Sequence, residues 1–341
     1  MNWITKINTV ETSGALYKPN QMVAEIAETI GFKVINYYNV PNMMPSYTIM
    51  DTYISAWFGM VRPGDLVVVQ FPDRMLNYQY FPRLMEYLHK IDEVKIVAFV
   101  HDIPTYFEEE TYFSENRWLQ ALRGFDALIV HNEKMANQLR QDGVDVPMVK
   151  LGVFDFLYDG PVQEKHFDTK AYLVTGRRVK DLVRMTNNLT TKFEIFGNVD
   201  KQKQDNLIYR GSHPEEKIIA EIDGGFGIVS ITGGMNLSNS WNFYGTLNNP
   251  FKLSFYLAAG IPIVVGKDSA HAMWIENENI GLAVDSMAEL DHKLNNLSEV
   301  DYLKMIDNVK PIRDSVISGF FTKRALLEVI AILRVDFYNN F

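Results

Sequence analysis

The chain has 341 residues and no cysteine, which excludes disulfides, zinc–thiolate sites, iron–sulfur clusters and cysteine nucleophiles. It contains no Asp-x-Asp pair and no His-x-x-x-His spacing, so the sequence predicts no metal cofactor. A Gly-x-Ser-x-Gly elbow, a P-loop and a Gly-x-Gly-x-x-Gly fingerprint are also missing. Hydrolases, NTPases and dinucleotide-dependent enzymes therefore have no basis in this sequence.

Basic residues are too few for a nucleic-acid-binding surface. The chain has 33 lysines and arginines against 42 aspartates and glutamates, a net charge of −9, and no basic run. No apolar run approaches the roughly 20 residues of a membrane span. The first residues lack the basic and apolar regions of a signal peptide. We therefore expect a soluble, cytoplasmic protein that binds no nucleic acid.

Apolar sequence is plentiful, and its pattern predicts the fold class. Hydrophobic residues make up 47% of the chain and aromatic residues 13%, as in well-packed globular proteins. Short apolar runs alternate with helical patterns, which indicates α/β structure with doubly wound parallel sheets. The expected strands are 3–7, 32–38, 66–71, 95–100, 127–130 and 148–151, then 172–175, 193–196, 207–209, 226–231, 261–265 and 282–284.

The length exceeds that of one ordinary core and predicts two domains. Residues 156–170 lack periodicity and mix glycine, proline and charge, so we interpret them as a linker. Two Rossmann-like domains are expected at 1–155 and 171–318. An amphipathic helix within 319–341 should pack back on the first domain. Loops at the carboxyl ends of both sheets would then face one cleft.

The stretch Leu247–Val265 predicts a loop, a short apolar helix and a buried strand. Asn248, Asn249, Lys252 and Ser254 lie at the helix entrance. A cation, a hydroxyl and two amides beside the positive end of a helix dipole suit a phosphate or diphosphate. The alternative is an ordinary connection with a solvated lysine.

Two arginines follow the first strand of the second domain. Arg177 and Arg178 come directly after Gly176, where their guanidinium groups can pair with phosphate oxygens in bidentate fashion. Together with Lys252 they could neutralise both charges of a diphosphate leaving group without a metal.

Two strand ends in the first domain carry further candidates. Thr12, Ser13 and Gly14 follow the first strand, where a small loop allows a ligand to approach the backbone, although an ordinary turn is the alternative. His101 and Asp102 follow the strand at 95–100. Either could take a proton from an acceptor hydroxyl. Alternatively, Asp102 caps the next turn and His101 is a packed, hydrogen-bonded imidazole.

Several blocks of the sequence together resemble a known family: Phe99–Pro104, Ala127–Met135, Tyr209–Ser212, Gly224–Gly227 and Pro250–Pro262. They are similar to the GT-B glucosyltransferases of bacterial accessory-secretion loci. Those enzymes add the second sugar to O-linked GlcNAc on serine-rich-repeat adhesins. The resemblance runs from about residue 12 to 284. It implies a GT-B fold, a UDP-sugar donor bound mainly by the second domain, an acceptor-binding first domain, no metal and a homotetramer.

The resemblance also assigns residues. The family's phosphate-binding lysine falls on Lys252 and its arginine on Arg178, with Arg177 one register away. Its tyrosine beside the nucleotide falls on Tyr209, and its Thr/Ser loop falls on residues 12–14.

The resulting hypothesis is a metal-independent hexosyltransferase that extends O-GlcNAc on a serine-rich-repeat adhesin from a UDP-sugar. Glucose is the favoured sugar. GlcNAc stays open, because relatives tend to carry acidic residues between Met235 and Leu247, where this chain has Asn, Ser and Trp. The paired-glutamate motif of many retaining enzymes is absent, so the anomeric outcome also stays open. The alternatives are a surface-polysaccharide transferase, for instance a galactofuranosyltransferase, and a non-catalytic nucleotide-sugar-binding partner.

Overall fold

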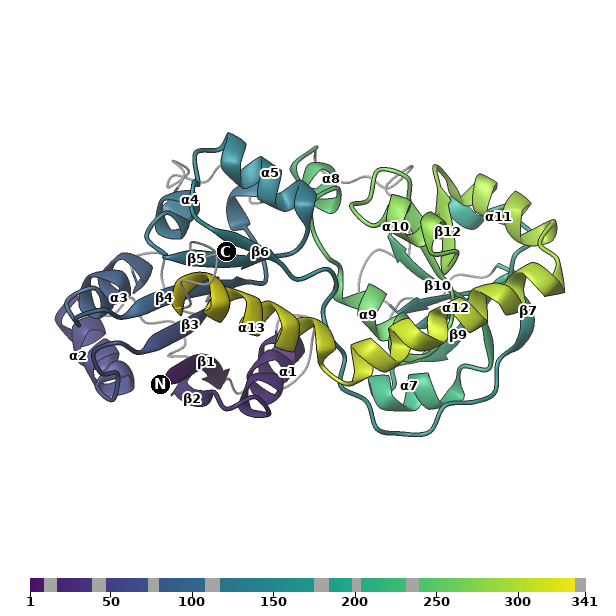
Figure 1. Ribbon diagram of the computed structural model, residues 1–341. Helices are drawn as coiled ribbons and strands as arrows, with labels where there is room; N and C mark the ends of the chain where they lie inside the picture. Colours follow the sequence, from purple (N-terminus) through teal and green to yellow (C-terminus); the bar gives the residue numbers. More distant parts are fainter. Residues whose placement is uncertain are drawn as a thin grey trace, which may run out of the picture. The chain divides into compact units, whose positions relative to one another are not determined.

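The computed structural model describes residues 1–8, 17–38, 47–72, 80–107, 117–174, 184–197, 204–230 and 239–334. The chain divides into two compact units (Figure 1). The first consists of Met1–Asp155 with the chain from Gly319 onward, and the second of Phe156–Ser318. Each unit contains one six-stranded sheet whose paired strands all run parallel. The expected α/β class with two doubly wound, Rossmann-like domains is confirmed.

The sheet of the first unit has the strand order β2-β1-β3-β4-β5-β6. Its strands are β1 Asn2–Asn8, β2 Lys33–Tyr38, β3 Leu66–Phe71, β4 Lys95–Val100, β5 Ala127–Val130 and β6 Met148–Lys150. Every residue of β3 and β5 is buried, as expected for central strands covered on both faces. The connecting helices are α1 Tyr17–Glu28, α2 Tyr47–Phe58, α3 Tyr80–Leu88, η1 Pro104–Tyr106, α4 Arg117–Leu122 and α5 Glu133–Gln141.

Helix α13, Phe320–Arg334, returns to the first unit and contacts α1, β5 and β6. The carboxylate of Asp155 accepts hydrogen bonds from the backbone N–H groups of Phe321 (3.1 Å) and Thr322 (2.7 Å). These are first-turn donors that have no partner within the helix. At the other end of α13, Arg334 donates to the carbonyl of Gly64 (2.7 Å). The helix is thereby attached at both ends to the unit where the chain begins.

The sheet of the second unit has the order β12-β11-β10-β7-β8-β9. Its strands are β7 His166–Val174, β8 Phe193–Phe196, β9 Leu207–Gly211, β10 Gly224–Ser230, β11 Ile263–Gly266 and β12 Gly281–Val284. Its labelled helices are α7 Glu215–Glu221, α8 Asn239–Gly245, α9 Phe251–Ala258, α10 Ala272–Asn277, α11 Met287–Asn295 and α12 Glu299–Ile317. Strand β7 takes in residues 166–170, which the sequence analysis assigns to the linker.

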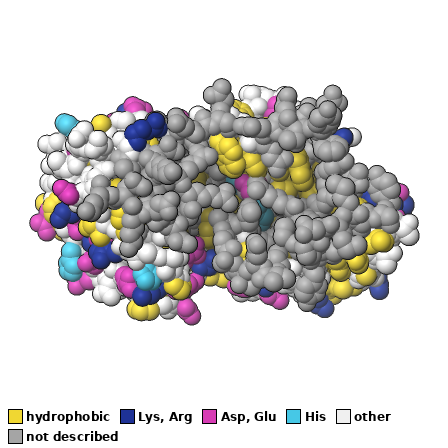
Figure 2. Space-filling model, turned by 180° about the vertical axis from the view of Figure 1, so that it is seen from behind, with side chains coloured by type: hydrophobic (Ala, Val, Ile, Leu, Met, Phe, Trp, Pro, Cys, Tyr) yellow, Lys and Arg dark blue, Asp and Glu magenta, His cyan; other side chains and the backbone are white. Residues whose placement is uncertain are grey.

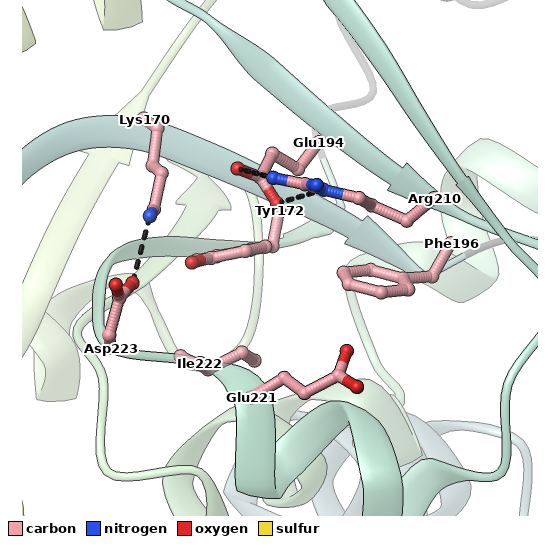
Figure 3. A pocket seen from close by; sticks show the side chains of 8 residues that line it. All are labelled: Lys170, Tyr172, Glu194, Phe196, Arg210, Glu221, Ile222 and Asp223. Atoms are coloured by element: carbon pink, nitrogen blue, oxygen red, sulfur yellow. Dashed lines mark hydrogen bonds and ion pairs between the residues drawn. The ribbon is translucent and has the colours of Figure 1, made fainter. Parts of the chain in front are cut away.

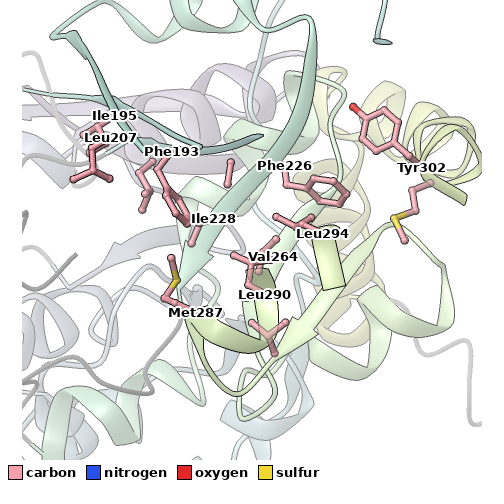
Figure 4. Packing of buried hydrophobic residues seen from close by; sticks show 14 of the residues in the cluster. Phe193, Ile195, Leu207, Phe226, Ile228, Val264, Met287, Leu290, Leu294 and Tyr302 are labelled. Carbon is pink, nitrogen blue, oxygen red and sulfur yellow. The ribbon is translucent and has the colours of Figure 1, made fainter. Parts of the chain in front are cut away.

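One face of this second sheet packs against α11 and the first half of α12 (Figure 4). Phe193, Phe226 and Val264 from the sheet meet Leu290 and Tyr302 from these helices. The sequence analysis predicts neither α11 nor α12. Helix α9, which carries the predicted phosphate-binding residues, contacts β10 and β11.

Charged side chains of both signs are intermingled over the described part of the surface seen in Figure 2. Large apolar side chains are exposed mostly as single residues, for example Met273 and Val300, which is ordinary for a globular surface. Among the described helices, none combines the length and apolar character needed to cross a membrane.

Candidate functional site

Helix α9 carries the residues that the sequence predicts for phosphate binding. Pro250 precedes the helix with an extended backbone and provides no side-chain cap, so the side chain that commonly satisfies first-turn N–H groups is missing. Lys252 lies in the first turn and Ser254 is buried beyond it. Asn248 and Asn249 lie in the segment that enters the helix. Lysine, hydroxyl and amides thus meet at an uncapped helix start in the second unit.

Unsatisfied polar atoms lie in α9 and in the residues before it. Within the described part of the chain, the buried Oδ1 atoms of Asn242 and Asn248 and the buried Oγ of Ser254 have no hydrogen-bond partner. Leaving a buried polar atom unpaired costs about 1–3 kcal/mol, so three such atoms close together in the sequence point to a ligand that completes them.

Lys252 also lacks a partner among the described residues, and its side chain is charged. Its ammonium group has no hydrogen-bond or ion-pair partner among the described residues, and its side chain is only partly exposed. Burial lowers the pKa of Lys252, because a desolvated ammonium is unfavourable without a counter-charge. An anionic ligand would supply that counter-charge.

Asn249 differs from its neighbour because its side chain is already held by a histidine. Its Oδ1 lies 2.7 Å from Nε2 of His271, and both side chains are buried. His271 directly precedes α10, so this bond connects the entrance of α9 to the loop after β11. Asn249 therefore shapes the helix entrance. The sequence analysis does not identify His271, because the two residues meet only through the fold.

Tyr256 connects α9 to the end of β7. Its hydroxyl accepts a hydrogen bond from the backbone N–H of Val174 (3.0 Å) and donates one to the carbonyl of Tyr172 (3.0 Å). The ring lies against β10 at Gly227, where an added Cβ would be 2.1 Å from Tyr256 Cγ. Because Tyr256 lies one helical turn after Lys252, this clamp fixes the helix face that carries the lysine.

Tyr256→Phe tests this clamp. Loss of the hydroxyl leaves the Val174 N–H unpaired, which should lower the free energy of unfolding by about 1–3 kcal/mol. The KM for the donor should also rise, since the clamp acts at the end of β7, directly before residues 175–178. Tyr302→Phe is the matched control, because its hydroxyl accepts from Gly225 N–H (2.9 Å) at the amino end of β10. Similar stability loss with a raised KM only in Tyr256→Phe is expected. Equal KM values in both variants would contradict the clamp.

Some predicted ligand residues lie outside the described residues: Thr12, Ser13, Gly14, Arg177 and Arg178. Val174 ends β7 shortly before the two arginines, and Asn8 ends β1 before the Thr/Ser loop. Both segments therefore follow the carboxyl ends of inner strands of their sheets, where doubly wound folds bind ligands.

Tyr209 lies in β9, the edge strand of the second sheet. It is partly buried and packs against the hydrophobic cluster of that unit. Strands β7 and β8 separate β9 from β10, a spacing of about 14 Å at the usual strand separation. Its expected place beside the nucleotide stays a prediction.

In the first unit, His101 and Asp102 follow the carboxyl end of β4. The His101 ring stacks on Phe154, with a centroid distance of 5.6 Å and an interplanar angle of 8°. Its Nε2 lies 2.7 Å from Oε1 of Gln70. Burial lowers the pKa of His101 to about 3, so the ring is neutral at physiological pH. Asp102 is partly exposed at the same sheet edge.

The neutral His101 predicts a pH dependence of stability. The ordinary pKa of 6.5 is lowered to about 3 in the folded protein, so below pH 6.5 the unfolded chain binds one proton more than the folded protein. The free energy of unfolding therefore decreases as the pH is lowered. Between pH 7 and pH 5 the wild type should lose about 1–2 kcal/mol more than His101→Gln. Urea unfolding at both pH values measures this difference, and parallel losses would contradict it.

A cavity of about 200 Å³ lies in the second unit (Figure 3), and none of its lining residues belongs to α9. Its lining residues are Lys170, Tyr172, Glu194, Phe196, Arg210, Glu221, Ile222 and Asp223. Lys170 pairs with Asp223 at 2.8 Å, and Arg210 pairs with Glu194 through two contacts of 2.9 Å. These four side chains are already paired with one another, so this cavity shows no unpaired charge among them that calls for a ligand. Elsewhere too, the described residues include no cluster of three or more His, Asp or Glu suited to a metal ion.

Comparison with known proteins places both units in one family. Residues 1–153 match the N-terminal domain and residues 172–329 the C-terminal domain of the glucosyltransferase 3-like family. Glucosyltransferase 3 of Streptococcus gordonii is 27% identical, over 93% of this chain and 94% of its own. Beta-1,6-galactofuranosyltransferase WbbI of Escherichia coli (strain K12) is 24% identical, over 83% and 84%.

Solved structures agree on the fold. An alpha,alpha-trehalose-phosphate synthase (UDP-forming) from Burkholderia vietnamiensis aligns with a TM-score of 0.61 and 10% identity. The alignment covers 97% of this chain and 99% of that one. The expected GT-B fold is confirmed.

Proposed function

The chain belongs to the glucosyltransferase 3-like family and is a glycosyltransferase, and we propose that it transfers glucose from UDP-glucose without a metal. The proposed acceptor is O-linked GlcNAc on a serine-rich-repeat adhesin, and GlcNAc is the alternative donor sugar. The observation that carries this proposal is the partly buried Lys252 in the first turn of α9, whose ammonium has no partner among the described residues.

In this proposal the cationic groups stabilise the departing UDP. Breaking the bond between the sugar C1 and the diphosphate oxygen concentrates negative charge on the leaving group, and a preorganised cation lowers the barrier most at that stage. Lys252 supplies one charge and Arg178, or Arg177 beside it, the other. The Ser254 hydroxyl donates to a phosphate oxygen and Asn248 completes the hydrogen bonding, while Tyr209 lies beside the nucleotide.

The acceptor side belongs to the first unit. We propose that Asp102 takes the proton of the acceptor hydroxyl that attacks the sugar C1, because a carboxylate at this sheet edge can act as a general base. His101 accepts a hydrogen bond from a neighbouring hydroxyl of the acceptor sugar and so orients the sugar, since a ring whose pKa is about 3 binds a proton weakly. The loop Thr12–Gly14 contacts the donor. We further propose that the protein works in the cytoplasm as a homotetramer, which sedimentation analysis can test.

Galactofuranose transfer to a surface polysaccharide is the second candidate. The similarity to a galactofuranosyltransferase over 83% of this chain favours it. One experiment separates the two proposals: incubation with UDP-glucose, UDP-GlcNAc and UDP-galactofuranose, each with a GlcNAc-modified Ser/Thr-rich peptide or a polysaccharide acceptor. Mass spectrometry should show one added hexose on the peptide from UDP-glucose. Transfer only to the polysaccharide would replace the adhesin proposal with the second candidate.

A further inference from the structure

Gln70 is a polar residue in the otherwise apolar strand β3, and its side chain is completely buried. Its Nε2 donates hydrogen bonds to the carbonyls of Thr5 (2.7 Å) and Asn20 (2.9 Å). Its Oε1 lies 2.7 Å from Nε2 of His101. One carboxamide thus joins β1, α1 and the residue that follows β4.

This arrangement fixes the direction of the amide. A primary amide has two N–H donors on nitrogen and only acceptors on oxygen. The two carbonyl oxygens of Thr5 and Asn20 can only accept, so both must face the nitrogen of Gln70. The amide oxygen is therefore the atom that faces His101, and the usual ambiguity between amide nitrogen and oxygen is resolved by the contacts.

The amide direction in turn decides the histidine tautomer. An oxygen that only accepts requires a donor, so the hydrogen of neutral His101 is on Nε2. The lone pair is then on Nδ1, which has no hydrogen-bond partner among the described residues. Parallel stacking on Phe154 holds the ring plane.

Other ionisable groups around His101 leave this assignment unchanged. His131 packs edge-on against the same Phe154 (5.2 Å), and its Nε2 lies 3.1 Å from the carbonyl of Val100. Asp102 is the next residue in the chain. Among the described residues, Gln70 is therefore the group that sets the protonated nitrogen of His101.

We propose that Gln70 is a positioning residue that holds His101 as the Nε2–H tautomer, with Nδ1 directed at a hydroxyl group of the acceptor sugar beside the one that reacts. The second half of this statement rests on the proposed function, whereas the tautomer does not. If Gln70 only filled space, replacing it would change neither the protonation of the His101 ring nitrogens nor the kinetics with the acceptor.

The test is ¹⁵N NMR of the full chain labelled at histidine, with His101→Asn to assign the resonances. The wild type should show protonated Nε2 and unprotonated Nδ1 on His101. Gln70→Met removes the acceptor oxygen and should lose this tautomer. Protonated Nδ1 in the wild type would overturn the proposal even if no variant folds.

Steady-state kinetics test whether Nδ1 of His101 faces the acceptor sugar. Gln70→Met should lower kcat/KM for the GlcNAc-peptide by about 10-fold, as expected for one lost hydrogen bond, with the KM for UDP-glucose unchanged. Thr5→Val is the control, because it removes only the acceptor of the Gln70 backbone N–H (2.9 Å) and leaves the carboxamide contacts. It should change stability and leave kcat/KM near wild type. The expected tautomer with unchanged acceptor kinetics would overturn the positioning role alone. Absence of any hexose transfer by the wild type would overturn the proposed function.

Discussion

Replacing Lys252 by methionine should lower kcat for hexose transfer by about 10²-fold or more. The partly buried ammonium has no counter-charge among the described residues, so its stabilising effect should appear when the diphosphate departs. Methionine keeps most of the volume of the lysine stem and relieves the desolvation of the charge, so the folded state should be at least as stable. Steady-state UDP release with the GlcNAc-peptide measures the effect.

Lys165→Met is the matched control for this variant. Lys165 is another partly buried lysine of the second unit, and burial lowers its pKa to about 8. Its ammonium already donates to the carbonyl of Ile222, so we expect it to make no contribution to ligand binding. The control should retain near wild-type kcat. Equal losses in the two variants would show that Lys252 acts through stability rather than through the leaving group.

Gly227→Ala should disrupt both folding and catalysis. An added Cβ would lie 2.1–2.5 Å from three ring atoms of Tyr256, and β10 is held between β7 and β11. Helix α9 must therefore shift, which costs about 1–3 kcal/mol or more for overpacking. The shift moves Lys252 together with the helix, so transfer should fall about 10²-fold, as expected for a misplaced reacting group. Urea unfolding and UDP release measure the two effects.

Gly124→Ala provides the comparison, because its added Cβ would meet nothing nearer than 3.3 Å. It should change the free energy of unfolding little and leave transfer unaffected. If Gly227→Ala were as stable and active as Gly124→Ala, the Tyr256 ring would not pack against β10 as described.

The sequence predicts the strands of both sheets well, because buried parallel strands are short continuous apolar runs with clear ends. Helices α11 and α12 are missed for a physical reason. Helix α12 has weak amphipathic periodicity and contains Pro311. These helices are stabilised by packing of Leu290 and Tyr302 on the sheet, and this tertiary context is invisible in a local pattern.

In the candidate site, too, features that are local in sequence are predictable and contacts between distant residues are not. Lys252 and Ser254 are predictable because helix start, cation and hydroxyl are close together in the sequence. The contacts that hold them in place join distant residues, such as Tyr256 with Val174 and Asn249 with His271. Likewise, a glutamine within an apolar strand is noticeable in sequence, but its link to His101 exists only once β3 and β4 pair.

The most direct test of the central claim is calorimetric titration of UDP and of uridine into the wild type and Lys252→Met. If the start of α9 binds the diphosphate, UDP should bind the wild type much more tightly than uridine does. Lys252→Met should lose about 10- to 100-fold of the UDP affinity, the value of one hydrogen bond to a charged group, and none of the uridine affinity. An equal preference for UDP over uridine in both proteins would contradict the assignment of Lys252 to the diphosphate.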